Sequence, residues 1–385
     1  MRDKKRVNKR VLIILGDDQQ VLPMIKGFHD LGCFVCVYCK SVLDVGYVSR
    51  YKDAAIREYY NMKDPEGTER RIIEVIENSN FELIVPTNDF VATVLSKNKD
   101  RIPKGKRVAV NNWNSHRIAC DKYLTMKTCK DIGIPCPKTC VVHDLEELNY
   151  SEWLFPLIIK PRVGYGAHGF FIIKNKDDLE QKYAKEQQQF GEMLIQEYIP
   201  AGGRQFQVEI VIDEKGEIAN AIVLDKLRWY PLNGGSSTIN KVVKNDTIVN
   251  NCATLLRSIG WKGYASLDMI EDVRDNAFKV LEINPRINGT VKVCFKLGID
   301  ISLQMIECAF GLPISHFEIS TEKDLYIRHF HKDVLWFMKS KKRFHTSPNW
   351  FSWKNTTDEI IDFRNPLPMI TYSISSIGKL LFHQF

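Results

Sequence analysis

Two acidic strand segments near residue 275 constrain the fold more than any other feature of this sequence. Residues 263–270 and 278–284 both alternate as strands do, and the polar stretch 272–276 between them predicts a hairpin loop. A hairpin centred near Asp275 places Asp268 opposite Glu282, and Asn284 projects from the same face as Glu282. Carboxylates opposed in this way repel each other, so we expect a cation between them.

The side chains on this face favour magnesium as the cation. Asp268, Glu282 and Asn284 offer only oxygen ligands, which suit Mg²⁺ held together with substrate phosphates. Arg286 follows at the strand end, where it could reach a charged reactant. The alternative is a solvated hairpin with ordinary surface acids.

Composition excludes several classes of protein. The 385 residues are enough for two or three domains. Lys and Arg are spread along the chain and the formal charge is only +7, so no nucleic-acid-binding surface is indicated. We recognise no transmembrane segment and no secretory signal, and ten cysteines are compatible with a reducing cytoplasm.

Three cysteines have the spacing of a metal motif, but we expect them to bind none. Cys33, Cys36 and Cys39 lie in a segment that reads as a buried strand. Residues three apart on a strand face opposite ways, so the thiolates cannot converge on one ion. His329 and His331 have no acidic partner nearby in sequence and are expected to be structural.

The N-terminal third alternates between strands and helices. Strands are expected at 11–15, 34–38 and 83–86, and helices at about 19–31 and 69–78. This rhythm predicts a parallel, doubly wound domain that ends near residue 112. Gly16 after the first strand is only a weak sign of phosphate binding, because no G-x-G-x-x-G motif follows.

A glycine-rich turn joins two further predicted strands, 157–160 and 170–173. The turn contains Gly164, Gly166 and Gly169, whose backbone N–H groups could fold over phosphates. Lys160 stands beside it and can reach those phosphates as a point charge. A flexible hairpin tip with a solvated lysine is the alternative.

Two later segments could contact ligands. The strand 193–200 is interrupted by Gln196 and Glu197 and could present backbone groups to an adenine edge, although an ordinary sheet strand is the simpler interpretation. The loop 233–238, with Arg228 nearby, would suit a carboxylate substrate, and a mobile surface loop is its alternative. The candidate substrate residues are Arg228, Gly234, Gly235, Ser236 and Ser237.

The order of these motifs is more specific than any single one. Lys122, Lys160 with its glycine-rich turn, residues 196–199, Asp268 and Glu282-x-Asn284-x-Arg286 occur in an order that resembles the ATP-grasp superfamily. The resemblance covers about residues 11–310. It is strongest to carboxylate–amine ligases with carbamoyl-phosphate-synthetase-like or D-aspartate-ligase-like cores.

The resemblance implies a combined α/β and α+β fold. An N-terminal doubly wound parallel α/β domain would precede a two-lobed ATP-grasp fold. The implied boundaries are 1–112 for the N-terminal domain, 113–192 for the small lobe with its lid, 193–315 for the central lobe with the metal site, and 316–385 for a C-terminal extension of unknown role.

The resemblance also implies roles for individual residues. Lys122 and Lys160 would contact ATP phosphates, and Lys160 and Arg286 would act in catalysis. Many relatives carry an acid for the ribose where Gln205 stands here. The other implied contacts are Gly164, Gly166 and Gly169 in the lid, Gln196, Glu197, Tyr198 and Ile199 at the adenine, and Asp268, Glu282 and Asn284 at the metal.

The implied reaction is ATP-dependent joining of a carboxylate to an amine through an acyl phosphate, giving an amide, ADP and phosphate. ATP and one or two Mg²⁺ ions would be required, with Mn²⁺ as an alternative. The partners would be small carboxylates and amines, and a homodimer is an open alternative. A different ATP-grasp phosphoryl-transfer enzyme, a carboxylase, or a non-catalytic nucleotide-binding protein are the rival functions.

The last fifty residues combine basic and aromatic side chains. Lysines and an arginine cluster at 339–343, and the stretch 369–385 is largely apolar. We expect this tail to pack its aromatic side chains on the core. The alternative is a docking element for an anionic membrane surface or an envelope-synthesis partner.

Overall fold

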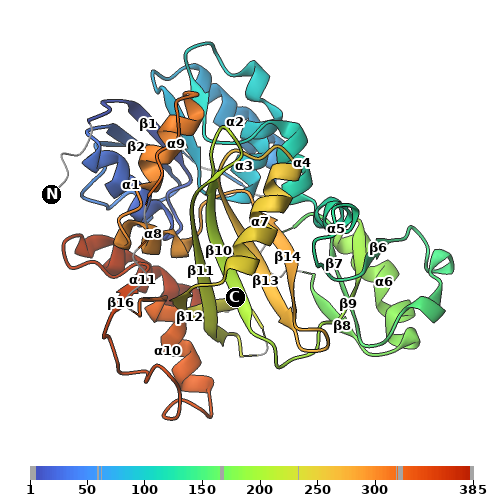
Figure 1. The fold of residues 1–385 in the computed structure, drawn as a ribbon. Coiled ribbons are helices and arrows are strands. Elements are labelled where there is room, and N and C mark those ends of the chain that lie inside the picture. The colour runs from blue at the N-terminus through green and yellow to red at the C-terminus, as the bar shows by residue number, and fades with distance from the viewer. Residues whose placement is uncertain are drawn as a thin grey trace.

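The computed structural model describes residues 6–58, 60–61, 63–164, 169–232, 234–317, 319 and 324–381. Figure 1 shows three sheets, with the N-terminal domain and the small lobe on different sides of a large central sheet. This arrangement agrees with the α/β and α+β architecture expected from the sequence.

The N-terminal sheet is parallel and has the strand order β3-β2-β1-β4-β5. Alternate residues of β1 enter different cores: Val11 and Ile13 pack with α1, whereas Leu12 and Ile14 pack with α2 and α3. Helices therefore cover both faces, which explains the continuous apolar runs of the strands. The elements are β1 (Arg10–Ile14), α1 (Val21–Asp30), β2 (Phe34–Cys39), β3 (Ala54–Arg57), α2 (Pro65–Glu77), β4 (Leu83–Pro86), α3 (Asp89–Lys97) and β5 (Arg107–Val108).

The sheet also separates the cysteines as predicted. Cys33 and Cys39 pack in the core on one side, and Cys36 packs in the core on the other. The expectation that strand geometry divides these thiols between two faces is confirmed. The absence of a bound metal at these thiols stays a prediction.

The small lobe is a four-stranded antiparallel sheet in the order β6-β9-β7-β8. One face is covered by α6, whose Leu179 and Tyr183 share a core with Leu157 and Ile159 of β7. Two short helices lead into this lobe from the N-terminal domain. The elements are α4 (Trp113–Cys120), α5 (Lys122–Asp131), β6 (Thr139–Val141), β7 (Leu157–Pro161), β8 (Phe171–Ile173), α6 (Lys176–Phe190) and β9 (Met193–Glu197).

The central sheet has seven strands in the order β14-β13-β10-β11-β12-β15-β16. Helix α7 packs on one face, while α8 and α9 lie between the other face and the N-terminal domain. The elements are β10 (Gln205–Ile212), β11 (Ile218–Tyr230), β12 (Ser236–Val243), α7 (Asp246–Ser258), β13 (Gly263–Asp272), β14 (Ala277–Asn284), α8 (Lys292–Lys296) and α9 (Ile301–Ala309).

The C-terminal segment extends the central sheet. Its strand β15 (Tyr326–Arg328) pairs with β12, and β16 (Thr356–Asp358) pairs in parallel with β15. Helices α10 (Phe330–Lys339) and α11 (Pro366–Leu381) accompany these strands. The expectation that the tail packs its aromatic side chains on the core is met only in part. Strand β16 joins the central sheet and Trp336 is buried, whereas Phe344, Phe351, Trp353 and Phe363 stay exposed.

Among the described residues, no helix is both long and apolar enough to span a bilayer.

Candidate active site

The β13–β14 hairpin has the register that the sequence predicts. Asp268 pairs directly with Glu282, and the register shifts by a bulge between Asp268 and Met269. Asn284 lies on the same face and its Nδ2 donates to Oδ2 of Asp268 at 3.3 Å. Two carboxylates and an amide therefore converge on one edge of the central sheet.

Two lysines neutralise these acids from neighbouring elements. Lys226 on β11 places its Nζ 2.5 Å from Oδ1 of Asp268. Lys122 at the start of α5 places its Nζ 3.8 Å from Oε2 of Glu282. Because Lys122 also donates to the carbonyl of Gly164 at 2.7 Å, it ties the glycine-rich turn to the acidic hairpin.

Lys160 is the third lysine of this group. It lies near the end of β7, where burial lowers its pKa to about 8 and the charge of Glu282 acts in the opposite direction. Lys160, Lys122, Asp268, Glu282 and Asn284 are thus brought together from four elements, β7, α5, β13 and β14. They were all proposed from the sequence as residues that bind phosphate or metal.

The two carboxyl groups differ in their electrostatics. Burial raises the pKa of Asp268, but Lys226 more than offsets this effect and the pKa is lowered overall. Burial and then the Asp268 charge raise the pKa of Glu282, with Lys122 and Lys160 offsetting only part of the rise. Glu282 is therefore the acid that gains most from a further cation.

The donor atoms fit a magnesium ion only if a ligand completes the coordination. The described residues contain no group of three or more His, Cys, Asp or Glu side chains placed to hold a metal. Asp268, Glu282 and the amide of Asn284 offer oxygen atoms alone, which Mg²⁺ accepts when phosphates supply the rest. This set suits a metal that arrives together with a nucleotide.

Arg286 connects the hairpin with the N-terminal domain. Its Nε lies 3.3 Å from Oδ2 of Asp89, and its Nη2 lies 3.5 Å from Oδ1 of Asn284. Burial lowers the pKa of Arg286, but Asp89 outweighs this and the pKa is raised overall. Asp89 begins α3 directly after Asn88, whose side chain caps the helix by accepting from the Val91 amide.

A buried polar network supports the loop that follows Arg286. Thr290 Oγ1 donates to Oε1 of Glu209 at 2.5 Å, and Tyr264 donates to the other oxygen of that carboxylate. Asn288 Nδ2 donates to Oγ of Ser266 at 2.8 Å. These bonds fix residues 288–290 and hence the direction in which Arg286 leaves β14.

The segment proposed for adenine uses its first two side chains within the protein. Gln196 is buried and donates to Oγ1 of Thr139 at 2.7 Å. The carboxylate of Glu197 pairs with Lys279 and Arg274, each at 3.1 Å. Glu197 therefore links the small lobe with the β13–β14 hairpin, and only Tyr198, Ile199 and the backbone are left to meet a base.

The proposed substrate residues all lie on the β11–β12 hairpin. Arg228 is only 2% exposed and forms a bidentate ion pair with Asp333, so its guanidinium has no free face for a carboxylate ligand. Gly234 and Gly235 lie at the β11–β12 turn, and Ser236 and Ser237 lie in β12, where they pair with Tyr230 and Trp229. Arg228 is two residues from Lys226 on β11, but its side chain pairs with Asp333 of the C-terminal segment.

Two other proposed ligand residues have different outcomes. Gly166 lies outside the described residues, while Gly164 and Gly169 flank that gap. Gln205 begins β10, where it pairs with Lys226 of β11 and with Ile270 of β13. Gln205 is therefore next to the lysine that contacts Asp268.

The sequence did not identify Lys226, Asp89 or Glu359 as members of this region. Glu359 follows β16, and its Oε2 accepts from Nε2 of Gln19 at 3.1 Å. The same oxygen lies so close to Gly289 that a Cβ there would be 2.1 Å away. Burial raises the pKa of Glu359 to about 7, although the charge of Lys332 opposes this. The sequence offered one signal for such residues, which is a polar residue shortly after a parallel strand. Asp89 follows β4 in this way.

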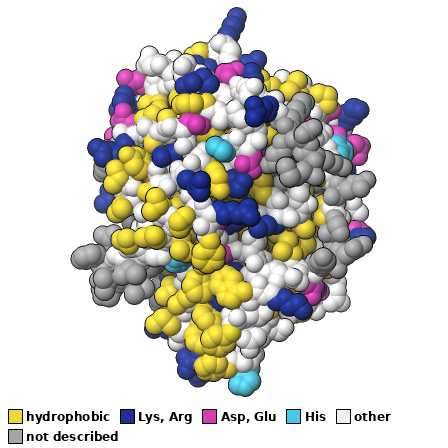
Figure 2. All heavy atoms as spheres, turned by 90° about the vertical axis from the view of Figure 1, so that its left-hand side faces the viewer, with side chains coloured by type: hydrophobic (Ala, Val, Ile, Leu, Met, Phe, Trp, Pro, Cys, Tyr) yellow, Lys and Arg dark blue, Asp and Glu magenta, His cyan; other side chains and the backbone are white. Residues whose placement is uncertain are grey.

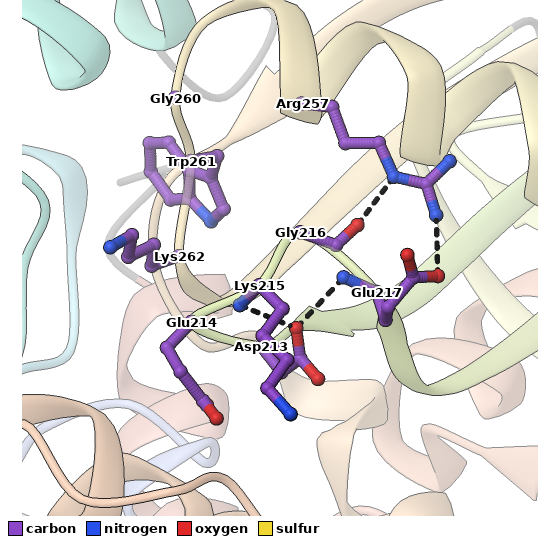
Figure 3. Close-up of a pocket in the computed structure, with 9 residues that line it drawn as sticks. All are labelled: Asp213, Glu214, Lys215, Gly216, Glu217, Arg257, Gly260, Trp261 and Lys262. Atoms are coloured by element: carbon purple, nitrogen blue, oxygen red, sulfur yellow. Dashed lines mark hydrogen bonds and ion pairs between the residues drawn. The ribbon is translucent and has the colours of Figure 1, made fainter.

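A surface hollow at the β10–β11 turn is separate from this site. Figure 3 shows its lining, in which Arg257 donates to the carbonyl of Gly216 and pairs with Glu217 at 3.6 Å. Asp213 at this turn is six residues along β10 from Gln207, the partner of Asp268, which corresponds to roughly 20 Å. Asp213 accepts from the backbone N–H groups of Lys215 and Glu217 and also pairs with His316.

Comparisons with known proteins agree with this geometry. Residues 119–290 match the sequence model of the ATP-grasp domain family. D-aspartate ligase of Enterococcus faecium is 23% identical over 300 residues, covering 71% of this chain and 70% of the ligase. The carbamoyl phosphate synthase large chain of Pseudomonas syringae is 25% identical over 83% of this chain, which spans only 31% of that protein.

Solved structures show the same fold at low sequence identity. The L-amino acid ligase from Bacillus licheniformis matches with a TM-score of 0.64 and 17% identity, covering 83% of this chain and 79% of that one. The biotin carboxylase domain of 2-oxoglutarate carboxylase from Hydrogenobacter thermophilus, solved with MgADP and bicarbonate, matches with a TM-score of 0.67 and 19% identity, covering 82% and 71%.

Proposed function

Because residues 119–290 are an ATP-grasp domain, we propose that the protein is an ATP-dependent ligase that activates a carboxylate as an acyl phosphate and couples it to an amine. The observation that carries this proposal is the group of three lysines around the Asp268–Glu282 pair. Cations in excess of carboxylates on one face suit a polyphosphate. A protein that only stabilised a hairpin would not need them.

The lysines would hold and orient the phosphates of ATP. Lys122 and Lys160 carry their charge to the side of the hairpin that faces the glycine-rich turn. Gly164 and Gly169 at the ends of that turn, with Gly166 between them, would let backbone N–H groups approach phosphate oxygens. Closing this turn would exclude water, which protects an acyl phosphate from hydrolysis.

Asp268, Glu282 and Asn284 would hold one or two Mg²⁺ ions, with Mn²⁺ as an alternative. When bound, the metal would neutralise the charge of the phosphoryl group during the transfer of that group to the carboxylate substrate. Burial and the charge of Asp268 raise the pKa of Glu282, and a bound cation would favour its carboxylate form. Lys226 would shift its contact from Asp268 toward the incoming ligand.

Arg286 would stabilise the transferring phosphoryl group. Its guanidinium is anchored by Asp89 and Asn284 and by the loop 288–290, which limits the reorganisation needed during reaction. Lys160 would contribute charge to the same transition state. The protein would need no nucleophilic side chain, because positioning and charge stabilisation suffice for phosphoryl transfer.

The rest of the nucleotide would lie between the lobes. Tyr198 and Ile199 would frame the adenine, and Gln205 would hydrogen-bond the ribose with its amide. The carboxylate and the amine are small molecules. A cytoplasmic location, where ATP is available, and a homodimer are parts of the same proposal. The L-amino acid ligase and D-aspartate ligase relatives, as named, support the choice of a carboxylate–amine reaction.

A carboxylase is the second candidate, because one structural neighbour is a biotin carboxylase domain bound to bicarbonate. Both functions transfer a phosphoryl group from ATP to a carboxylate-like group. The test must therefore compare organic carboxylates with bicarbonate as the group that accepts the phosphoryl. We would incubate the protein with ATP, Mg²⁺ and pooled carboxylic acids, with hydroxylamine as the trapping amine, and follow phosphate release and hydroxamate formation.

The proposed ligase predicts that phosphate release depends on an organic carboxylate and yields a hydroxamate. Phosphate release that requires bicarbonate and yields no hydroxamate would support the carboxylase instead. The Glu282→Gln variant is the matched control, because a contaminating ATPase would be unaffected by it. Absence of both activities, with ATP still bound, would leave a nucleotide-binding function.

A further inference from the structure

Hydrophobic side chains gather on the surface of the C-terminal segment. Among the described residues, eight of the eighteen large hydrophobic side chains that stay exposed lie between residues 338 and 374, with exposures of 44% to 85%. Figure 2, which faces the side of the molecule that carries α11 and α10, shows hydrophobic side chains over the lower part of this face. The residues of this C-terminal patch are Met338, Phe344, Phe351, Trp353, Phe363, Leu367, Ile370 and Ile374.

Most charged residues in and around the patch are basic, and Asp362, beside Phe363, is the partly exposed exception. Between residues 334 and 357 every charged side chain is basic. The nearest acids in the chain, Asp333, Asp358 and Glu359, are all buried. The exposed cations beside these apolar side chains therefore have no acidic neighbour within residues 334–357. They are Lys339, Lys341, Lys342, Arg343 and Lys354, and all five are exposed.

We propose that the C-terminal patch docks the protein on an anionic membrane surface. Aromatic and aliphatic side chains gain free energy by entering the boundary between headgroups and acyl chains. Basic side chains beside them are attracted to anionic lipids, by about a factor of five per residue near the surface. An apolar patch of this kind is also uncommon on a monomeric protein without a binding function.

The excess of basic charge argues against a second copy of the chain as the occupant. In a symmetric dimer the same patch would face itself, so the five basic residues of one copy would meet the five of the other. Like charges juxtaposed across an interface are unfavourable. A membrane rich in anionic lipid offers complementary charge over the whole patch.

The patch is held in shape by the core beneath it. Trp350 donates from Nε1 to the carbonyl of Asp333 at 3.1 Å, and Arg228 donates to the carbonyl of Pro348 at 3.0 Å. The Trp350 ring also lies 4.3 Å from that of Phe337. The loop 340–354 is therefore preorganised. In Figure 1 the small lobe lies on the opposite side of the central sheet, so docking would leave the glycine-rich turn free.

The test is flotation of the full-length protein with lipid vesicles. One set contains phosphatidylcholine alone and the other contains about a third phosphatidylserine, each at low and at raised salt. The patch variant is Lys341→Glu with Lys342→Glu and Arg343→Glu. The matched control reverses three exposed lysines elsewhere, Lys104→Glu with Lys127→Glu and Lys130→Glu, and so has the same net charge. A third variant, Phe351→Ser with Phe344→Ser, removes apolar contact without changing charge.

We expect the wild-type protein to float with the anionic vesicles and the patch variant to bind them at least tenfold more weakly, because three cations are lost. The control should bind within about threefold of wild type, and the serine variant should bind more weakly even at raised salt. Equal loss in patch variant and control would overturn the proposal, because net charge alone would explain binding. So would absence of wild-type flotation. If the wild type instead associates with an acidic protein or with itself through the patch, a protein partner replaces the membrane.

Discussion

Two clusters of basic and acidic side chains in this protein have opposite designs. In the cleft, Asp268 and Glu282 are 21% and 35% exposed, and lysines approach them from separate elements. Behind the β11–β12 hairpin, Asp333 is fully buried between Arg228 and Arg328, which are 2% and 1% exposed. The first cluster leaves charge for a ligand, whereas the second uses its charges to hold the protein together.

The surroundings of the two clusters explain this difference. The guanidinium of Arg328 stands over the rings of Trp350 and Trp353, each at 4.8 Å, and that of Arg228 stands 4.9 Å from Trp336. Thr238 adds a hydrogen bond of 2.6 Å to Asp333. Aromatic walls and ion pairs to one shared carboxylate make the Asp333 cluster structural. Lysines from separate elements beside two partly exposed acids make the Asp268–Glu282 cluster a candidate for binding.

The largest effect is expected at Asp333. Asp333→Ala leaves two buried guanidinium groups without their shared carboxylate, so the free energy of unfolding should fall by about 3–5 kcal/mol. Urea denaturation followed by tryptophan fluorescence measures this loss. Arg228→Met is a second variant that removes charge and keeps apolar bulk, and it should cost less. An Asp333→Ala protein as stable as wild type would show that the Asp333 cluster does not hold the protein together. The contrast between the two clusters would then be wrong.

At the candidate active site, substitution of Glu282 should reduce turnover and should not reduce stability. Glu282→Gln should lower turnover by roughly 100- to 1,000-fold, because it removes a charge that the phosphates and metal require. In the absence of metal the variant should be slightly more stable than wild type, since repulsion with Asp268 is relieved. Normal turnover at saturating Mg²⁺ would show that the β13–β14 hairpin is not the metal site.

Glu359 combines burial with a place beside the cleft, and pH should reveal its state. Its pKa is raised from 4.5 to about 7 by burial, so the folded state favours the protonated form. The free energy of unfolding should therefore be greatest below pH 4.5, fall as pH rises to about 7, and stay level above that. The total fall is at most about 3 kcal/mol.

Glu359→Gln should remove this pH dependence. The stability difference between variant and wild type should favour the variant more at about pH 8 than at about pH 5. Denaturation curves at these two pH values give the difference directly. A difference that is the same at both pH values would mean that Glu359 titrates normally, and that burial does not raise its pKa.

Sequence reasoning identified the parts of the cleft that local rules determine. A short loop and a period of two place Asp268 opposite Glu282, so their pairing could be predicted without a structure. Lys160 was predicted because a strand and a glycine-rich turn meet at it. The alternation of strands and helices likewise predicted the parallel N-terminal sheet, although it missed β3 and β5.

The residues that sequence reasoning missed come from contacts between distant segments. Asp89 reaches Arg286 across 197 positions, and Lys226 reaches Asp268 only because β10 separates their strands in the sheet. Arg228 was proposed for a carboxylate substrate because it stands near the loop 233–238, whereas its partner Asp333 lies 105 residues away in the sequence. No local pattern shows that a basic residue will be buried against an acid from a later helix.

The account depends most directly on Lys160 as a ligand of ATP phosphate. Isothermal titration calorimetry with ATP and Mg²⁺ should show that Lys160→Ala weakens binding by about 1.5–3 kcal/mol, the range for a hydrogen bond to a charged group. The matched control Lys104→Ala, an exposed lysine, should bind as the wild type does. Equal ATP affinity in Lys160→Ala and wild type would contradict the proposed site.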